Sequence, residues 1–185
     1  MSLIIDQRTV TLEIANEFTC GKTPLNEVIE NFYNTKVAKE IKNKRSETKF
    51  ILSALCRKLF EIDNIIDQLT DKNISPRNIM VRNCIRIALI ELIDLDRPAY
   101  AVINSWVEIA KNKKRLMHFS KLINAILRKF LKNNTKSNLI VSKKIPGWLW
   151  NSWSNTYGKI EANKIIEASL TCLLYTSPSP RDLRR

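Results

Sequence analysis

Glycine is scarce in this sequence of 185 residues, which contains only Gly21, Gly147 and Gly158. None of the three stands in a G-x-G-x-x-G or G-x-x-x-x-G-K-[ST] pattern, through which glycine-rich loops bind dinucleotides or phosphates. The chain therefore has no recognisable nucleotide-binding loop. We expect no cofactor site in this chain and assign no catalytic residue.

Metal-ligand spacings and long apolar runs are also missing. Cys20, Cys56 and Cys84 lie far apart and only His118 could join them, so no zinc pattern exists, and we interpret the cysteines as buried, reduced thiols. No apolar run approaches the roughly 18 residues that span a bilayer, and no charged-then-apolar leader begins the chain. These absences predict a cytoplasmic protein with no metal site and no membrane segment.

Acidic residues are absent between Ile109 and Ile160, in a chain whose net charge is +13. Such a stretch cannot neutralise itself through local ion pairs, so its charge is available to the phosphates of a polyanion, most commonly RNA or DNA. The alternative is a solvated, solubilising face, although charge of that kind is usually mixed in sign. The cations of this stretch are Lys111, Lys113, Lys114, Arg115, Lys121, Arg128, Lys129, Lys132, Lys136, Lys143, Lys144 and Lys159.

The C-terminal residues 172–185 are set apart from the rest by their sequence. The string from Cys172 to Asp182 resembles a translated transposase mosaic-end adaptor, and we treat it as a fusion scar with a native end expected near Leu170 or Thr171. A genuine disordered C-terminal peptide is the alternative. The preceding residues suffice for one domain with a sizeable core and the beginning of a second.

Apolar residues recur at helical spacing throughout, and period-2 alternation is never sustained, so we predict an all-α fold. Ser75 is placed to cap a central helix with Pro76 at its first position, and the apolar residues of that helix cover nearly its whole circumference. Helices are expected over about 6–18 and 25–34, through Phe50–Leu55, through Ile62–Leu69, from Pro76, from Pro98, and from His118 or Phe119.

The last of these helices separates two faces. Lys121, Arg128 and Lys132 lie on one side, and we expect them to bind phosphate or to form a solvated face. We interpret Asn104 and Asn124 as structural residues that hydrogen-bond neighbouring elements. The opposite side carries the apolar residues Phe119, Leu122, Ile123, Ile126, Leu127 and Phe130, which predict core packing.

Two segments carry a family resemblance. The run from Arg97 to Lys111 (RPAYAVINSWVEIAK), followed by Leu122–Phe130 (LINAILRKF), resembles the signature of the NusB-like RNA-binding fold, a helical bundle. Residues 46–59, 81–95 and the Pro-x-Trp-Leu-x-x-x-Trp of 146–153 extend the similarity to about residues 8–170. The combination is specific, although each piece alone is weak.

Two kinds of protein share that fold: the stand-alone antitermination factor NusB, and Sun/RsmB-type small-subunit ribosomal RNA cytosine-C5 methyltransferases, which carry it as an N-terminal domain. Three features resemble the enzyme's domain. The segment Asn124–Arg128 ends in Leu-Arg, the N-terminal region has no arginine-rich box, and a tryptophan-rich segment follows Pro146. The runner-up is a free-standing regulator of transcription that binds a leader or ribosomal RNA. A reading frame that continues from Leu170 into a cofactor-binding domain would favour the enzyme, and a stop codon the regulator.

The resemblance implies a NusB-like RNA-binding domain over 1–134, a linker and first helices over 135–171 that lead to a missing catalytic domain, and the tail over 172–185. It also implies that the full-length parent uses S-adenosylmethionine, whereas this chain is not an enzyme as it stands. The expected partner is RNA, in particular small-subunit ribosomal RNA. The expected RNA-binding residues are Arg8, Lys111, Lys113, Lys114, Arg115, Lys121, Arg128, Lys129 and Lys132.

An aromatic cluster follows Lys144. Trp150, Trp153 and Tyr157 recur at i, i+3 and i+7, the spacing of a buried helical face, so we expect packing at a domain junction. The alternative for this cluster, which also includes Trp148, is stacking on RNA bases.

Overall fold

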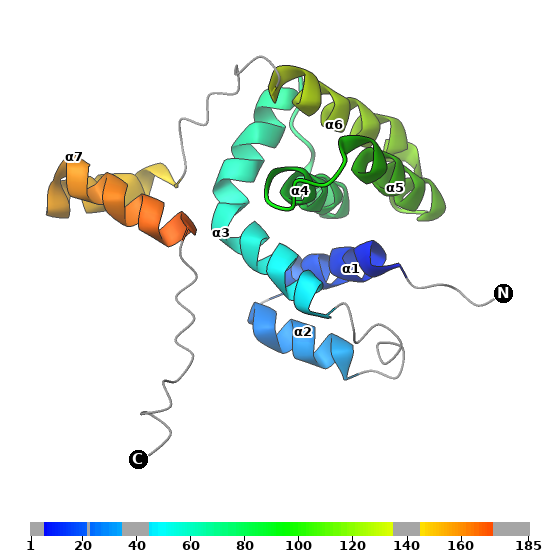
Figure 1. The fold of residues 1–185 in the computed structure, drawn as a ribbon, viewed down its shortest axis with the longest axis horizontal. Coiled ribbons are helices and arrows are strands. Elements are labelled where there is room, and N and C mark those ends of the chain that lie inside the picture. Colours follow the sequence, from blue (N-terminus) through cyan, green and yellow to red (C-terminus); the bar gives the residue numbers. More distant parts are fainter. Residues whose placement is uncertain (1–5, 22, 35–44, 135–144, 172–185) are drawn as a thin grey trace. The chain divides into compact units, whose positions relative to one another are not determined.

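The computed structural model describes residues 6–21, 23–34, 45–134 and 145–171, and within these ranges the chain is helical with short turns and contains no strand (Figure 1). The predicted all-α class is therefore confirmed. Two units are distinguished by their contacts, residues 1–142 and 143–185. The helices of the first unit are α1 (Gln7–Cys20), α2 (Leu25–Tyr33), α3 (Arg45–Leu69), α4 (Ile79–Ile93), α5 (Ala99–Asn112) and α6 (Ser120–Asn134); the second contains α7 (Gly147–Thr171).

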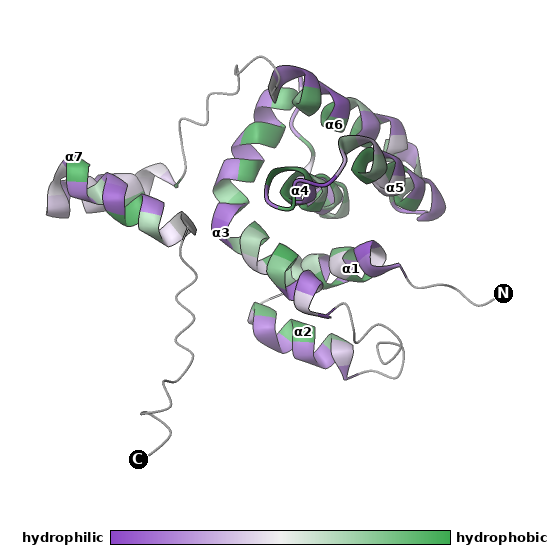
Figure 2. Ribbon diagram, viewed as in Figure 1, coloured by the Kyte–Doolittle hydropathy of each residue, from purple (hydrophilic) through white to green (hydrophobic). Residues whose placement is uncertain are grey.

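Helix α4 is the core of the first unit. It packs against α1, α3, α5 and α6, which surround it in Figure 1. Every residue from Asn83 to Glu91 is buried, as the apolar residues on nearly all sides of this helix predict. Helices at the outside are instead amphipathic, and α3 alternates between hydrophobic and hydrophilic residues along its length in Figure 2.

The two helices expected between Phe50 and Leu69 are one continuous helix, α3, so that prediction was wrong. The intervening segment from Cys56 to Glu61 contains no proline or glycine, and lysine, arginine, leucine and glutamate all favour the helical backbone. At 1.5 Å per residue, 25 residues extend roughly 37 Å. The helix therefore runs along the first unit and contributes buried residues to it from Thr48 to Leu69.

The start of the central helix also differs from the expectation. Pro76 does stand at the first position of a helical turn, but this is a 3₁₀ turn over Pro76–Asn78, and α4 begins only at Ile79. Ser75 makes no side-chain capping hydrogen bond, so its predicted role was wrong. Short 3₁₀ turns are common at the entrance of α-helices. A second one, Met117–Phe119, precedes α6, within two residues of the predicted start.

Helices α5 and α6 pack against each other and close one side of the unit (Figure 1). Trp106 of α5 and Ile123, Ile126, Leu127 and Phe130 of α6 are buried, which confirms most of the predicted apolar face. Leu122 is exposed, contrary to the prediction. Its position lies about 100° around the helix from Lys121, at the edge between the two faces.

Helix α7 contains a sharp break at Gly158. This residue has φ 78° and ψ 159°, a backbone conformation that is essentially reserved for glycine. Ala162 and Ile166 are buried, whereas Trp148, Tyr157 and Ile160 are exposed. The expected burial of Tyr157 on a helical face was therefore wrong, while Trp150 and Trp153 are half-buried.

The cysteines were expected to be buried, and only Cys84 is; Cys20 and Cys56 are exposed. Burial in α4 raises the pKa of the Cys84 thiol. Parts of several predictions fall outside the described residues: the lysine-rich connection before Ser46, the linker with Lys136, Lys143 and Lys144, and the adaptor-like tail.

Candidate nucleic-acid interface

Basic side chains gather at the C-terminal end of α5, in the turn that follows, and on the outward side of α6. Lys121, Arg128 and Lys132 lie at i, i+7 and i+11, which places them within about 40° on one side of α6. We call the exposed members of this set the α5–α6 basic surface; they are Lys111, Lys114, Arg115, Lys121, Arg128 and Lys132.

Two of the eight predicted RNA-binding cations on these elements have carboxylate partners from distant parts of the chain. Lys113 donates from Nζ to Oε1 of Glu13 in α1, over 2.7 Å. Lys129 lies 3.5 Å from Oδ1 of Asp71 and donates to the carbonyl oxygen of Leu69, at the C-terminal end of α3. A cation at this end also interacts favourably with the helix dipole. Both lysines therefore connect helices of the bundle, in addition to any contact with RNA.

Arg8 lies elsewhere, in a buried cluster around Glu91. The carboxylate of Glu91 is fully buried and accepts two hydrogen bonds from Nε of Arg8, at 2.9 and 3.1 Å, and one from its terminal nitrogen at 2.7 Å. Nε1 of Trp106 donates to the same carboxylate at 3.2 Å, and Arg97 at 3.1 Å. Burial, together with the nearby charge of Arg8, lowers the pKa of Arg97. The structure thus does not bring Arg8 into the α5–α6 basic surface.

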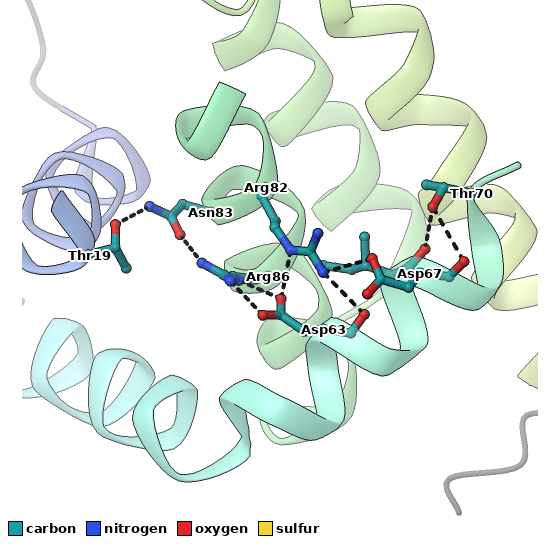
Figure 3. Close-up of polar contacts among 8 residues, drawn as sticks. Thr19, Asp63, Asp67, Thr70, Arg82, Asn83 and Arg86 are labelled. Atoms are coloured by element: carbon teal, nitrogen blue, oxygen red, sulfur yellow. Dashed lines mark hydrogen bonds and ion pairs between the residues drawn. The ribbon is translucent and has the colours of Figure 1, made fainter. Parts of the chain in front are cut away.

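A second ionic cluster joins α3 and α4 (Figure 3). Asp63 accepts hydrogen bonds from Arg86, at 2.7 and 2.6 Å, and from Nε of Arg82, at 2.9 Å. Arg82 also reaches Asp67 over 2.7 Å. Burial lowers the pKa of Arg82, but its bonds to Asp63 and Asp67 outweigh this effect, so the net pKa is raised. These arginines are therefore neutralised within the bundle, which the sequence pattern did not indicate.

The α3–α4 cluster continues toward α1 through hydrogen-bonded amides (Figure 3). Arg86 donates to Oδ1 of Asn83 at 2.7 Å, and Nδ2 of Asn83 donates to Oγ1 of Thr19 at 2.8 Å. Asn83 also donates to Oδ1 of Asn16 at 2.8 Å. A pocket of about 490 Å³ opens beside this network, and its walls include Phe18, Leu59 and Arg86. Since Arg86 is already paired with Asp63, the pocket offers little free charge to a ligand.

A smaller pocket of about 280 Å³ lies between α5 and α6, next to the α5–α6 basic surface. Arg128 forms part of its wall, and Nε of Arg128 donates to Oδ1 of Asn124 at 3.0 Å. Asn124 was expected to bond to a neighbouring element, and it bonds instead to Arg128 within its own helix. Asn104, also expected to be structural, is exposed, lines the pocket and makes no hydrogen bond with the described part of the chain.

Neither a metal site nor a membrane helix is found in the parts of the chain that the structure describes. No group of three or more histidine, cysteine or acidic side chains comes together there to hold a metal ion. The helices that are described include none with the length and apolar character needed to cross a bilayer. The candidate site is the basic surface with its neighbouring pocket, on the evidence of the exposed cations and the pocket lining.

This helical bundle belongs to the NusB family, because the sequence model of that family matches residues 6–132. The match covers α1 to α5 and all but the last two residues of α6, including every residue of the basic surface. The family resemblance of the Arg97–Lys111 and Leu122–Phe130 segments is thereby confirmed.

Similar full-length proteins carry methyltransferase names. A protein of Synechocystis sp. named "Probable ribosomal RNA small subunit methyltransferase B" is 27% identical over 144 residues, which are 72% of this chain and 31% of that protein. "Ribosomal RNA small subunit methyltransferase B" of Pasteurella multocida is 30% identical over 123 residues, 64% of this chain and 27% of that protein. The chain thus spans about a third or less of the length of these relatives.

Proposed function

We propose that this chain is the RNA-binding N-terminal part of an S-adenosylmethionine-dependent ribosomal RNA cytosine-C5 methyltransferase, and that it holds small-subunit ribosomal RNA through the α5–α6 basic surface. Family membership and the names of the two relatives support this function over that of a free-standing transcription regulator. The single observation that carries RNA binding is a surface of six exposed cations from a stretch without any acidic residue.

The tertiary structure strengthens the electrostatic argument. Arginines of α4 and the loop after it are paired with carboxylates of α3 and α4, as the Asp63 and Glu91 clusters show. The α5–α6 basic surface has no carboxylate among its members, and no ion pair occupies Lys114, Arg115 or Lys121 in the described ranges. Unpaired surface cations release counterions from nucleic acid when they bind phosphate, so they contribute to affinity in a salt-dependent way.

The spacing of the surface suits a nucleic-acid strand. Eleven residues separate Lys121 from Lys132, so the row on α6 spans roughly 16 Å. The turn with Lys114 and Arg115 lies before α6 and extends the row at its N-terminal end. If about five of these cations each neutralise one phosphate of a single strand, log affinity falls against log salt with a slope near −3.5, at about −0.7 per contact.

Methyl transfer is assigned by this proposal to a part of the parent protein outside the chain. The relatives are more than three times as long as the matched segment, which leaves room in them for a separate catalytic region. In the proposed parent, the present chain binds and orients the RNA, and its own residues take no part in the chemical step.

A matched pair of double variants tests the proposed surface. Arg115→Gln with Lys121→Gln removes two cations from it, and Arg77→Gln with Lys72→Gln removes the same two residue types from the exposed segment between α3 and α4. Affinity for a single-stranded fragment of small-subunit ribosomal RNA is measured by filter binding over a salt series. The first variant is expected to flatten the salt slope by about 1.4, and the second to leave it unchanged.

The two variants have the same net charge, so a general charge effect would lower both slopes equally. Circular dichroism confirms that each variant is folded. An unchanged slope in Arg115→Gln/Lys121→Gln, or an equal change in the control pair, would place RNA binding on another surface. No salt-dependent binding by the unmodified chain would contradict the proposed function itself.

A further inference from the structure

The α5–α6 pocket has the features of a binding site for a single unpaired RNA base. We propose that one base enters this pocket and stacks on Tyr100, while Arg128 binds the adjoining phosphate. This inference rests on the proposed RNA-binding function and specifies the form of RNA: a single strand or loop, and not a continuous duplex.

The ring of Tyr100 is the first observation. This residue stands in the first turn of α5 and is 78% exposed, whereas Trp106 on the same helix is completely buried. Tyr100 nevertheless lines the pocket, together with Ile103 of α5 and Leu131 of α6. A flat aromatic ring is thus open to solvent beside an apolar recess, which is the arrangement on which nucleic-acid bases stack.

The guanidinium of Arg128 is the second observation. Its Nε is bonded to Asn124 one turn earlier, which orients the group, and no carboxylate pairs with it within the described residues. The remaining N–H groups are available to a phosphate, for which the planar guanidinium is well suited. Arg128 also belongs to the row with Lys121 and Lys132, so the pocket lies directly beside the path proposed for the RNA backbone.

Asn104 adds a polar group to the pocket. Its exposed amide offers two donors and an acceptor and has no partner in the part of the chain that the structure describes. Such an amide can pair with the edge of a stacked base. Its test is separate from that of stacking: Asn104→Ala is expected to alter the preference among the four bases more than the average affinity.

The size of the pocket restricts the ligand. At about 280 Å³ it falls at the lower limit of the roughly 300–1,000 Å³ found for pockets that bury drug-sized molecules. One flat heterocycle fits this scale better than a complete nucleoside cofactor. Bases of an A-form duplex are stacked inside the helix and show their edges in a shallow groove, so they cannot enter such a recess without unpairing.

Substitutions of Tyr100 test the inference in the full chain. Tyr100→Leu removes the aromatic ring, and Tyr100→Phe retains it; the side chain is exposed, so neither change should affect folding. The probes are a single-stranded RNA of mixed sequence and the same sequence in a duplex. Tyr100→Leu is expected to weaken single-strand binding by roughly 5- to 160-fold, because stacking contributes about 1–3 kcal/mol per base. Tyr100→Phe keeps the ring and should weaken binding by less than about twofold.

The salt slope separates this inference from the proposed function. Loss of stacking removes no cation, so the slope for Tyr100→Leu should equal that of the unmodified chain, while Arg128→Gln should flatten it by about 0.7. Phe50→Leu, which removes an exposed aromatic ring from α3, is the control and should bind normally.

Equal affinities of Tyr100→Leu and the unmodified chain would overturn the pocket assignment and leave the basic surface intact. Tighter binding of the duplex than of the single strand would overturn it as well. So would a loss of affinity in Tyr100→Phe as large as in Tyr100→Leu, because the hydroxyl and not the ring would then be required. If the unmodified chain binds no RNA, the proposed function fails first, and this inference fails with it.

Discussion

At the scale of single residues, Glu91 shows how a buried charge organises the bundle. Glu91 stands near the end of α4, and its buried carboxylate accepts hydrogen bonds from Arg8 of α1, Arg97 of the following loop and Trp106 of α5. Arg97 also pairs with Glu47 of α3. A buried carboxylate without partners would be strongly destabilising, so these contacts make the positions of four helices depend on one another.

Arg8 is therefore expected to be important for stability. Arg8→Gln should lower the free energy of unfolding by about 3 kcal/mol, at the low end for breaking a buried ion pair because Arg97 and Trp106 remain. The melting temperature should fall by roughly 6–12 °C. The free energy of unfolding of Arg8→Lys should lie between those of Arg8→Gln and the unmodified chain, because lysine keeps the charge but cannot form the bidentate contact. Lys111→Gln, an exposed change at the end of α5, should stay within about 0.5 kcal/mol.

The predicted role of Arg8 in RNA binding can be measured with the same variants below their melting temperatures. An undiminished affinity in folded Arg8→Gln would show that this residue acts only on stability. An Arg8→Gln variant with the melting temperature of the unmodified chain would instead contradict the contribution of the Glu91 cluster to stability.

At the scale of helices, the pairing of α3 with α4 depends on an ionic contact as well as on apolar packing. Asp63 bonds to both Arg82 and Arg86, and the Arg86 side chain is only 7% exposed. The side chain of Asp67, one turn further along α3, bonds to Arg82 and is 43% exposed. The two aspartates thus make the same kind of contact in different environments (Figure 3).

Identical substitutions at these two positions should give unequal effects. Asp63→Asn leaves the buried guanidinium of Arg86 without its counter-charge and should cost about 3–5 kcal/mol of unfolding free energy. Asp67→Asn removes a partly exposed pair and should cost less than about 1 kcal/mol. Urea unfolding measures both. Similar midpoints for the two variants would show that solvent reaches Arg86 and that the contact is weaker than its burial indicates.

At the scale of the whole molecule, we propose that RNA binding and methyl transfer belong to separate regions of the parent protein. An isolated RNA-binding part should not bind the methyl donor, and none of its three glycines stands in a nucleotide-binding pattern. Calorimetric titration of the chain with S-adenosylmethionine should therefore give no saturable heat. A stoichiometric heat with micromolar affinity would contradict the assignment of the cofactor site to a separate region.

Prediction from sequence was most successful where a feature depends on neighbouring residues. The approximate bounds of α1 and α2, the start of α5 after Pro98, and the burial of Ile123, Ile126 and Leu127 follow from local spacing and from helix-punctuating residues. It failed between Phe50 and Leu69, where two apolar groups lie on one uninterrupted helix. It also failed for Cys20 and Cys56, because residue type alone does not determine exposure.

The sequence by itself determined the helical class, the amphipathic faces and the stretch without acidic residues, since these depend on chain order and on the 3.6-residue period. Only the tertiary structure decided which cations are neutralised. Lys113 pairs with Glu13, 100 positions away, and Arg8 with Glu91, 83 positions away. Local sequence carries no record of such partners, because the ion pair forms only when folding brings separate helices within a few ångströms. For the same reason, the pocket between Tyr100 and Arg128 exists only once α5 packs on α6.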